Sequence, residues 1–526
     1  MTNTTERKFQ IAQQLNNFLE ILESIEDTLP SIKKNLFIEF KKKKDNYDDY
    51  LEKNTTRLTK DEEGQIIDFD LPLEKYRKAL ELRREVSKSL KIAIVVPINF
   101  LVSIISEYDA YLGELIKEIY INKPELLNSL EKNLTFSEIM DFQSIDKIKE
   151  FVIEKDIEST LRKSHLEHLS ILEKKFSITL TQGLDILPEF IEITERRNLF
   201  VHCKGIVSSQ YLKICSDNKV PLDNIHVGKK LYASNKYLLR AIHVISELVI
   251  KLTHVLWSKV FKEDQNNIDS NIIQLSFDLL CREKYQLVVD ILSLFLSKSA
   301  KQHSEVSKRY LIINMAIAYK SLGDRKKCSE LLSSYDWSAV SNLLIMAERI
   351  LLEDYKSAEE HFKKAYIADE IKKQYILEWP LFKEFRETAE FKNAYSELFP
   401  ENKQDYISLP ASSEGNEENE RDDHASQAEA LAEVVAQAEA EAQAEAEAQA
   451  ETEAQAETEP QAETEPQAET EAQAETEAQA ETEAQAETEA QAETEAQAET
   501  EPQAETEAQA ETEAQAETEP QAEKIK

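Results

Sequence analysis

The sequence predicts an all-α protein, and two observations support this prediction. Only seven glycines occur among 526 residues, whereas chains built of strands and tight turns need more turn residues. Apolar residues recur three and four positions apart along most of the chain, as in Leu15, Phe18, Leu19 and Leu22. A helix places residues at this spacing on one face. The predicted fold is therefore a helical bundle, followed by a helical-hairpin array and a disordered acidic tail.

The first part of the chain, residues 1–84, is predicted to be an N-terminal helical segment. Residues 1–60 are polar and rich in lysine, and the run Lys41–Lys44 is expected to be a solvated helix face. A loop is expected at Asp61–Pro72. From about Leu73 to Tyr120 the pattern is helical again, and its apolar run Ile92–Ile105 predicts a buried core helix.

Residues 85–265 are predicted to form a helical domain. Gly183 and Pro188 precede a helix that contains Arg197, Asn198 and His202. A loop is expected around Asp217–Gly228. A long amphipathic helix is expected from about Ser234 to Phe261.

Residues 266–400 resemble tetratricopeptide-type repeats in part. The resemblance rests on small and aromatic residues around a turn glycine, namely Ala316, Tyr319, Gly323 and Cys328. A second half-unit follows at Asp354–Ala358, but the interval from Cys328 to Ala358 is 30 residues, whereas a regular repeat has about 34. The prediction is a degenerate helical-hairpin array that offers a surface to a protein partner. An irregular helical domain without a groove is the alternative.

Residues 401–526 are predicted to be a disordered, low-complexity acidic tail. From Gln437 the sequence repeats six-residue units, mostly Gln-Ala-Glu-Thr-Glu followed by Ala or Pro. A six-residue period builds no apolar helix face, and the prolines interrupt any long helix. Residues 411–526 contain 37 acidic and 3 basic residues, a net charge of −34, whereas the rest of the chain has a net charge of −4.

The cysteines suggest a reducing compartment. They include no CxxC pair and no zinc-site spacing: Cys203, Cys215, Cys281 and Cys328. Free thiols predict a cytoplasmic protein. No metal and no cofactor are expected. The N-terminus has no apolar signal segment, and the run Ile92–Ile105 is shorter than the roughly 20 residues that span a bilayer. We therefore expect no membrane partner.

The motif that suggests a function is Arg197-Asn198-Leu-Phe-Val-His202. An arginine, a polar residue after it and a histidine five residues after the arginine resemble the motif of HEPN-domain ribonucleases, in particular bacterial members. The segments Gly205–Leu212 and Val227–Tyr232 resemble the flanks of that motif, so that the resemblance covers roughly residues 85–265. One departure is Cys203, because many relatives have asparagine directly after the histidine.

The resemblance implies a metal-independent RNA endonuclease, with roles as a toxin or anti-phage effector that are common in the family. In this chemistry, His202 suits the general base that takes the 2′-hydroxyl proton, and the guanidinium of Arg197 suits the phosphate oxygens. Asn198 can orient a hydroxyl group or the imidazole. One copy of the site is incomplete, and the family implies that two motifs face one cleft. A homodimer is therefore expected.

The charge around the motif is consistent with an RNA partner. Between Arg196 and Arg240, nine basic residues stand against Asp217 and Asp223, a net charge of +7. The predicted RNA-binding residues are Arg196, Lys204, Lys229, Lys230, Lys236 and Arg240. Scattered surface lysines that never converge are the alternative. Packing or surface roles are expected for the other candidate residues, His165, His168, His243 and His254.

A second class of function stays open from the sequence. The chain is then a non-catalytic helical adaptor that binds RNA, a nucleotide or a protein partner. Under the first hypothesis, the acidic tail is expected either to compete with RNA for the basic segment or to act only as a solubilising segment.

Overall fold

The computed structural model describes residues 4–60, 66–129, 134–135, 139–140, 142, 144–297 and 303–400. The all-α prediction is confirmed, because a single two-stranded sheet is the exception among the described elements. The predicted disorder of residues 401–526 lies outside the described residues.

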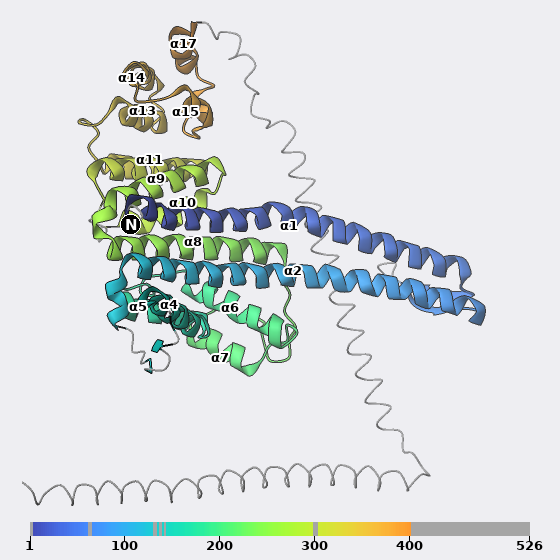
Figure 1. The fold of residues 1–526 in the computed structure, drawn as a ribbon. Helices are drawn as coiled ribbons and strands as arrows, with labels where there is room; N and C mark the ends of the chain where they lie inside the picture. The colour runs from blue at the N-terminus through green and yellow to red at the C-terminus, as the bar shows by residue number, and fades with distance from the viewer. Residues whose placement is uncertain are drawn as a thin grey trace, which may run out of the picture. The chain divides into compact units, whose positions relative to one another are not determined.

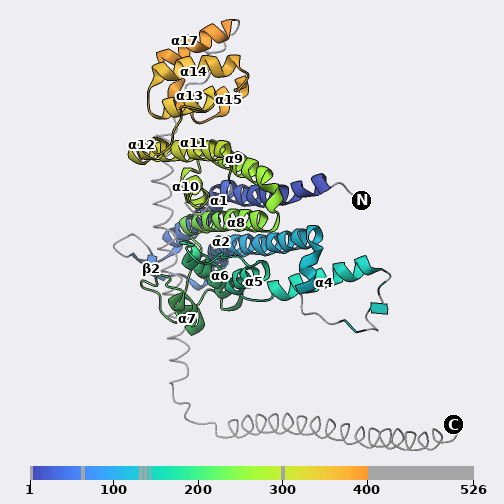
Figure 2. The same cartoon turned by 90° about the vertical axis from the view of Figure 1, so that its left-hand side faces the viewer.

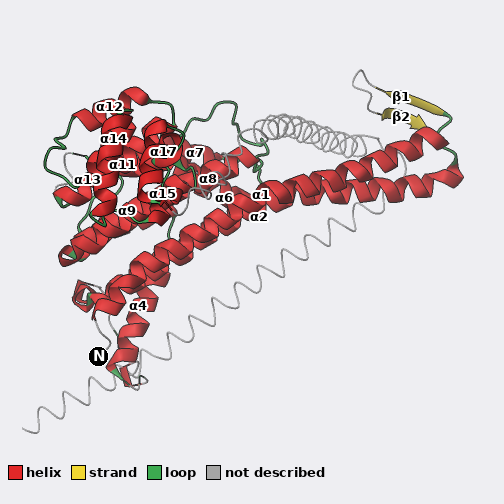
Figure 3. Cartoon of the chain, turned by 90° about the horizontal axis from the view of Figure 1, so that it is seen from above, coloured by secondary structure: helices red, strands yellow, loops and turns green. Residues whose placement is uncertain are grey.

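Two long helices, α1 (Thr4–Asn54) and α2 (Leu73–Asn122), lie side by side along the first part of the chain (Figure 1). Between them, β1 (Arg57–Lys60) and β2 (Ile66–Asp70) pair antiparallel, and Figure 3 shows this pair at one end of the two helices. The prediction of a loop at residues 61–72 was wrong for β2. Its Ile66, Ile67 and Phe69 are of types that favour extended backbone, which outweighs the turn residues beside them.

The apolar run of α2 is only partly buried. Ile92 and Val95 are 49% and 44% exposed, whereas Leu101, Ile104 and Ile105 are fully buried. The helix is long and apolar enough to cross a membrane by length and composition, with 28% of its most apolar 18-residue window buried. The predicted core helix is thus confirmed for the second half of the run only. The first half precedes the part of α2 that the bundle covers.

The helix α8 (Asn235–Val260) forms the centre of the core. Its buried residues lie on all sides, and it packs against α1, α2, α6 and α10. The side chain of Ser234 caps its first turn by accepting from the Tyr237 N–H. The predicted helix at 234–261 and the loop at 217–228 are both confirmed. Three further elements pack on α8, namely α5 (His165–Phe176), α6 (Leu187–His202) and η2 (Lys262–Asp264), whereas η1 (Pro124–Ser129) and α4 (Ile145–Leu161) pack on α2, and α7 (Ser209–Asp217) packs on α6.

The helices after α8 form successive hairpins (Figure 2). In three of these hairpins, the turn contains one residue with positive φ. These residues are Glu283 (φ 56°), Gly323 (φ 80°) and Glu353 (φ 63°). The predicted turn glycine is therefore correct, and the predicted small residues Ala316, Cys328 and Ala358 are buried between helices. The helices are α9 (Gln265–Cys281), α10 (Tyr285–Phe295), α11 (Glu305–Ser321), α12 (Arg325–Ser333), α13 (Asn342–Leu351), α14 (Tyr355–Ile367), α15 (Lys373–Glu378), α16 (Phe382–Phe385) and α17 (Ala389–Leu398).

One predicted segment boundary falls within a helix, and another falls near the start of one. The boundary after residue 84 falls inside α2, and α1 itself packs on α8. The boundary after residue 265 coincides with the start of α9. Helices α1 and α2 therefore belong with the bundle on which they pack.

Candidate functional site

The predicted catalytic residues all lie on α6, as the sequence predicts. Its inner face is buried through Phe190, Ile193 and Leu199. The helix ends at His202, where the Cys203 and Gly205 N–H groups both donate to the Leu199 carbonyl at 2.8 and 2.9 Å. The chain therefore turns sharply directly after the predicted general base.

Arg197 and Asn198 interact with each other. Arg197 Nη1 donates to Asn198 Oδ1 at 3.2 Å, and Asn198 Nδ2 donates to Glu195 Oε1 at 3.4 Å. Among the described residues, Arg197 Nε is buried and makes no hydrogen bond. His202, one turn further, is exposed. The imidazole is thus accessible to a substrate, whereas the guanidinium nitrogen without an acceptor lies below the surface.

Glu195 is a carboxyl group beside the motif that the sequence analysis did not single out. Burial raises its pKa above the ordinary value, while His165 and the Asn198 hydrogen bond oppose that shift. A carboxyl group with a raised pKa that contacts a motif residue, here Asn198, is a candidate for a functional role. No spacing pattern separates this glutamate from the other glutamates of the chain, so the sequence offered no signal for it.

Behind α6, the α5 histidines are packed in the core. His165 is 8% exposed and His168 is fully buried, and the His165 ring makes edge contact with Phe190. His165 Nε2 lies 3.3 Å from Asp109 Oδ1. Burial, together with the neighbouring His165, lowers the pKa of His168. The expected packing role of these histidines agrees with their placement.

Arg196 is placed differently from its neighbour Arg197. Its side chain is 14% exposed, and its Nε donates to Glu192 Oε1 at 2.7 Å. The guanidinium lies 4.1 Å from the centre of the Tyr237 ring, and Tyr211 also donates to Glu192. This geometry contradicts the predicted RNA contact of Arg196. Its charge is held inside the bundle because Glu192 is buried there and needs a partner.

Backbone pairing brings two distant lysine-bearing segments together. The Val207 N–H donates to the Lys229 carbonyl at 2.9 Å, and Ile206 forms a β-bridge with Lys230. Lys204 precedes this pairing in the turn after His202, with φ 51° and an exposed side chain. Lys229 and Lys230 therefore lie in a segment paired beside the end of α6, and Lys204 lies in the turn between α6 and that pairing.

The remaining predicted RNA-binding residues lie on α8. Lys236 is exposed in the first turn of that helix. Arg240 forms a two-pronged pair with Glu189, with N–O distances of 2.6 and 2.7 Å. Glu189 thus offsets the charge of Arg240, which weakens the case for an RNA contact there.

Exposed apolar side chains lie around the same end of α6. Val201 is 49% exposed, Ile206 45% and Val227 58%. Val201 precedes His202, and Val227 precedes Gly228, whose N–H donates to the Val207 carbonyl at 3.0 Å. The surface beside His202 therefore combines lysines with apolar groups, which suits a contact between macromolecules.

The histidines of α8 have separate environments. His254 is fully buried and lies 2.9 Å from Asn271 Oδ1, which agrees with the expected packing role. His243 instead lies within a polar network with Glu247 and Asp290. Two cavities of about 540 and 190 Å³ lie on either side of that network, and neither is lined by Arg197 or His202.

Comparison of the chain with protein-family models, with curated proteins and with solved structures finds no match.

Proposed function

We propose that the chain is a metal-independent RNA endonuclease of HEPN type that acts as a homodimer. The observation that carries this proposal is the end of α6. There Arg197 and Asn198 interact, His202 is exposed, Lys204 lies in the turn that follows, and Lys229 and Lys230 lie in the segment paired beside it. Cations and an exposed imidazole near one helix end suit a phosphodiester substrate.

In the proposed reaction, His202 takes the proton of the RNA 2′-hydroxyl. The 2′-oxygen then forms a bond to phosphorus and the bond to the 5′-oxygen breaks, which leaves a 2′,3′-cyclic phosphate and a 5′-hydroxyl. The guanidinium of Arg197, which lies beside Asn198 on the same helix, stabilises charge on the phosphate oxygens through its terminal nitrogens. The histidine of the second copy, when protonated, supplies the proton for the leaving oxygen.

A dimer supplies a second copy of the motif, because each copy contributes one motif histidine, the exposed His202, and the exposed His226 of the neighbouring segment lies outside the motif. The exposed side chains of Val201, Ile206 and Val227 are apolar groups that a second copy can cover. A two-fold contact through this surface brings the ends of two α6 helices together. The dimer and the active site are therefore proposed to share one surface.

The test is an RNA-cleavage assay with the full-length wild type and two variants, His202→Ala and Arg197→Ala. We expect cleavage by the wild type in the presence of EDTA and a loss of at least about 100-fold in each variant, the scale typical of a removed acid–base group. His361→Ala is the matched control, because His361 lies on α14, outside the motif helix. A wild type without cleavage, or an active His202→Ala protein, contradicts the proposal.

One observation favours a second class, the non-catalytic helical adaptor. The first half of the apolar run in α2 presents Ile92 and Val95 to solvent, and an unpaired apolar helix face is typical of protein–protein contacts. This function predicts a stable complex with RNA or a protein and no turnover. Binding without cleavage in the same assay distinguishes it from the endonuclease.

A further inference from the structure

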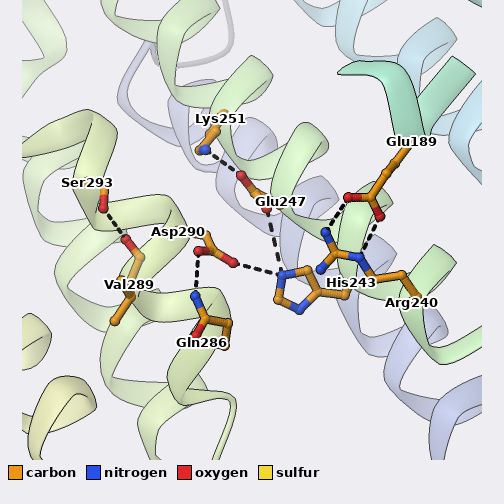
Figure 4. A network of polar contacts seen from close by, with 9 residues as sticks. All are labelled: Glu189, Arg240, His243, Glu247, Lys251, Gln286, Val289, Asp290 and Ser293. Carbon is orange, nitrogen blue, oxygen red and sulfur yellow. Dashed lines mark hydrogen bonds and ion pairs between the residues drawn. The ribbon is translucent and has the colours of Figure 1, made fainter. Parts of the chain in front are cut away.

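A histidine and two carboxylates, one of them buried, converge between α8 and α10 (Figure 4). His243 and Glu247 lie one turn apart on α8, and Asp290 faces them from α10. Their nearest side-chain nitrogen and oxygen atoms all lie within 4.8 Å of one another. The α6 motif contributes none of these residues.

The spacing of these atoms fits the first shell of a small divalent cation. His243 Nε2 lies 2.9 Å from Asp290 Oδ2 and 3.7 Å from Glu247 Oε2. Zinc–ligand bonds of about 2.0–2.2 Å in a tetrahedron place neighbouring ligand atoms roughly 3.3–3.6 Å apart. The two pairs that include the imidazole are within a few tenths of an ångström of that spacing, and the two carboxylate oxygens, which lie within 4.8 Å of each other, approach it by side-chain rotation.

Each carboxylate is held through its other oxygen. Gln286 Nε2 donates to Asp290 Oδ1 at 2.7 Å, and Lys251 Nζ donates to Glu247 Oε1 at 2.5 Å. The remaining oxygens, Oδ2 and Oε2, are the ones directed toward the imidazole (Figure 4). Outer hydrogen bonds of this kind orient metal-binding carboxylates in proteins.

Glu247 supplies an independent reason to expect a cation. It is 3% exposed, and its Oε2 makes no hydrogen bond to any described residue. A buried carboxylate oxygen without a hydrogen bond costs free energy. A metal ion bound between Oε2 and the imidazole removes that cost.

The net charge of the group with its surrounding side chains is negative, and two cavities give access to it. The Arg240–Glu189 pair is neutral in itself, and Lys251 offsets only one of the two carboxylates. Glu247 and Asp290 line the cavity of about 540 Å³, and His243 lines the cavity of about 190 Å³. Water or a small anion in the larger cavity can complete the coordination.

We propose that His243, Glu247 and Asp290 bind one divalent first-row transition-metal ion, of the Zn²⁺ type, with a coordination position open to the larger cavity. One imidazole with two carboxylates is a donor set that zinc accepts. The site lies outside the proposed endonuclease motif, so it is structural or serves a separate activity.

The experiment uses the full chain, freed of metals with a chelator and then dialysed. Zn²⁺ is titrated calorimetrically, and Co²⁺ is added separately so that its visible absorption reports the coordination geometry. We expect one tight site per chain and Co²⁺ bands of tetrahedral or five-coordinate character. His243→Ala and Asp290→Asn should each weaken Zn²⁺ binding at least about 100-fold, and Gln286→Leu, which removes an outer hydrogen bond, about tenfold.

The matched control is Asp278→Asn, a carboxylate on α9 that lines the smaller cavity but is not in the group. It should bind Zn²⁺ as the wild type does. The proposal fails if the wild type binds no Zn²⁺, or if all four variants bind it equally, which places the ions elsewhere, such as on the acidic tail. Because Asp290 is partly exposed, Asp290→Asn should fold, and circular dichroism checks this. The readout involves no RNA, so failure of this proposal is distinct from failure of the endonuclease.

Discussion

Gly205 and Leu231 are joined by a backbone hydrogen bond, in which the Leu231 N–H donates to the Gly205 carbonyl at 2.8 Å. This bond begins the pairing that brings Lys229 and Lys230 beside the end of α6. Gly205 has φ 81°, and a Cβ atom there would lie 2.9 Å from the Leu231 carbonyl oxygen and 3.3 Å from the Phe200 ring. No other residue type fits at this position without displacing the lysine segment.

Gly205→Ala should therefore lower the free energy of unfolding by about 2–4 kcal/mol, because it adds backbone strain to a close contact. Urea denaturation measures this loss. Gly228→Ala is the control, since Gly228 has φ 88° but nothing within 4 Å of the added Cβ, and it should lose only about 1 kcal/mol. Equal losses in the two variants would show that the contact with Leu231 is unimportant.

Arg196→Met tests the structural role assigned to Arg196. Removing the guanidinium leaves Glu192 buried without its cation, and the cost should be about 3–5 kcal/mol. At a temperature where the variant is folded, its RNA affinity should equal that of the wild type.

The double variant Lys229→Ala, Lys230→Ala should give the opposite pattern, with unchanged stability and weaker, less salt-dependent RNA binding. A folded Arg196→Met protein with weakened RNA binding would support the sequence-based prediction that Arg196 contacts RNA.

Stability should fall at alkaline pH because of tyrosines around Glu192. Burial, together with the Glu192 carboxylate, raises the pKa of Tyr211 and Tyr237 above their ordinary value. In the unfolded chain tyrosine ionises near pH 10. The free energy by which these neutral tyrosines favour the folded state is therefore complete below about pH 10. Above that pH the unfolded chain loses its phenol protons and the folded one keeps them, so the free energy of unfolding declines by about 1.4 kcal/mol per pH unit for each such tyrosine. Urea midpoints between pH 8 and 11 should show this decline, and Tyr211→Phe should make it less steep.

The hairpin turns offer a stabilising substitution. Glu283 has φ 56°, a conformation that costs a residue with a side chain about 1 kcal/mol. Glu283→Gly should raise the free energy of unfolding by about 0.5–1 kcal/mol, whereas Gly323→Ala should lower it by about 1 kcal/mol. Glu353→Gly should gain less, because Glu353 pairs with Lys320 at 3.5 Å and with Arg325, whereas Glu283 has an exposed pair, with Lys383 at 3.8 Å. Thermal unfolding of the three variants measures these differences, and a destabilised Glu283→Gly protein would contradict the turn argument.

Val227→Asp tests the proposed dimer surface. A charge at this 58% exposed position should leave the fold intact, and it should shift a dimer toward monomer by like-charge repulsion across the two-fold axis. The sedimentation coefficient and the rate of RNA cleavage should fall together. Ile367→Asp, at a 79% exposed position on α14, is the control and should change neither. A monomeric wild type that cleaves RNA would refute the need for dimerisation.

The sequence by itself determined the helical class and many of the helix ends. Ser234 at the start of α8, Pro188 at the start of α6 and Gly323 in a hairpin turn all act through their own backbone or the next few residues. The three motif residues share one helix for the same reason, since five residues span little more than one turn. Such signals are local, and neighbouring residues are sufficient to read them.

The tertiary structure decided which side chains are buried, paired or exposed. Arg196 and Arg197 are adjacent, yet about 100° of helix rotation turns the first toward Glu192 and the second toward Asn198. His243 and Asp290 meet although 47 residues separate them, and no spacing rule predicts that contact. Ile92 looked like a core residue and is exposed because the bundle covers only the later part of α2. In each case the outcome depends on a distant partner, whose position follows from how the helices pack.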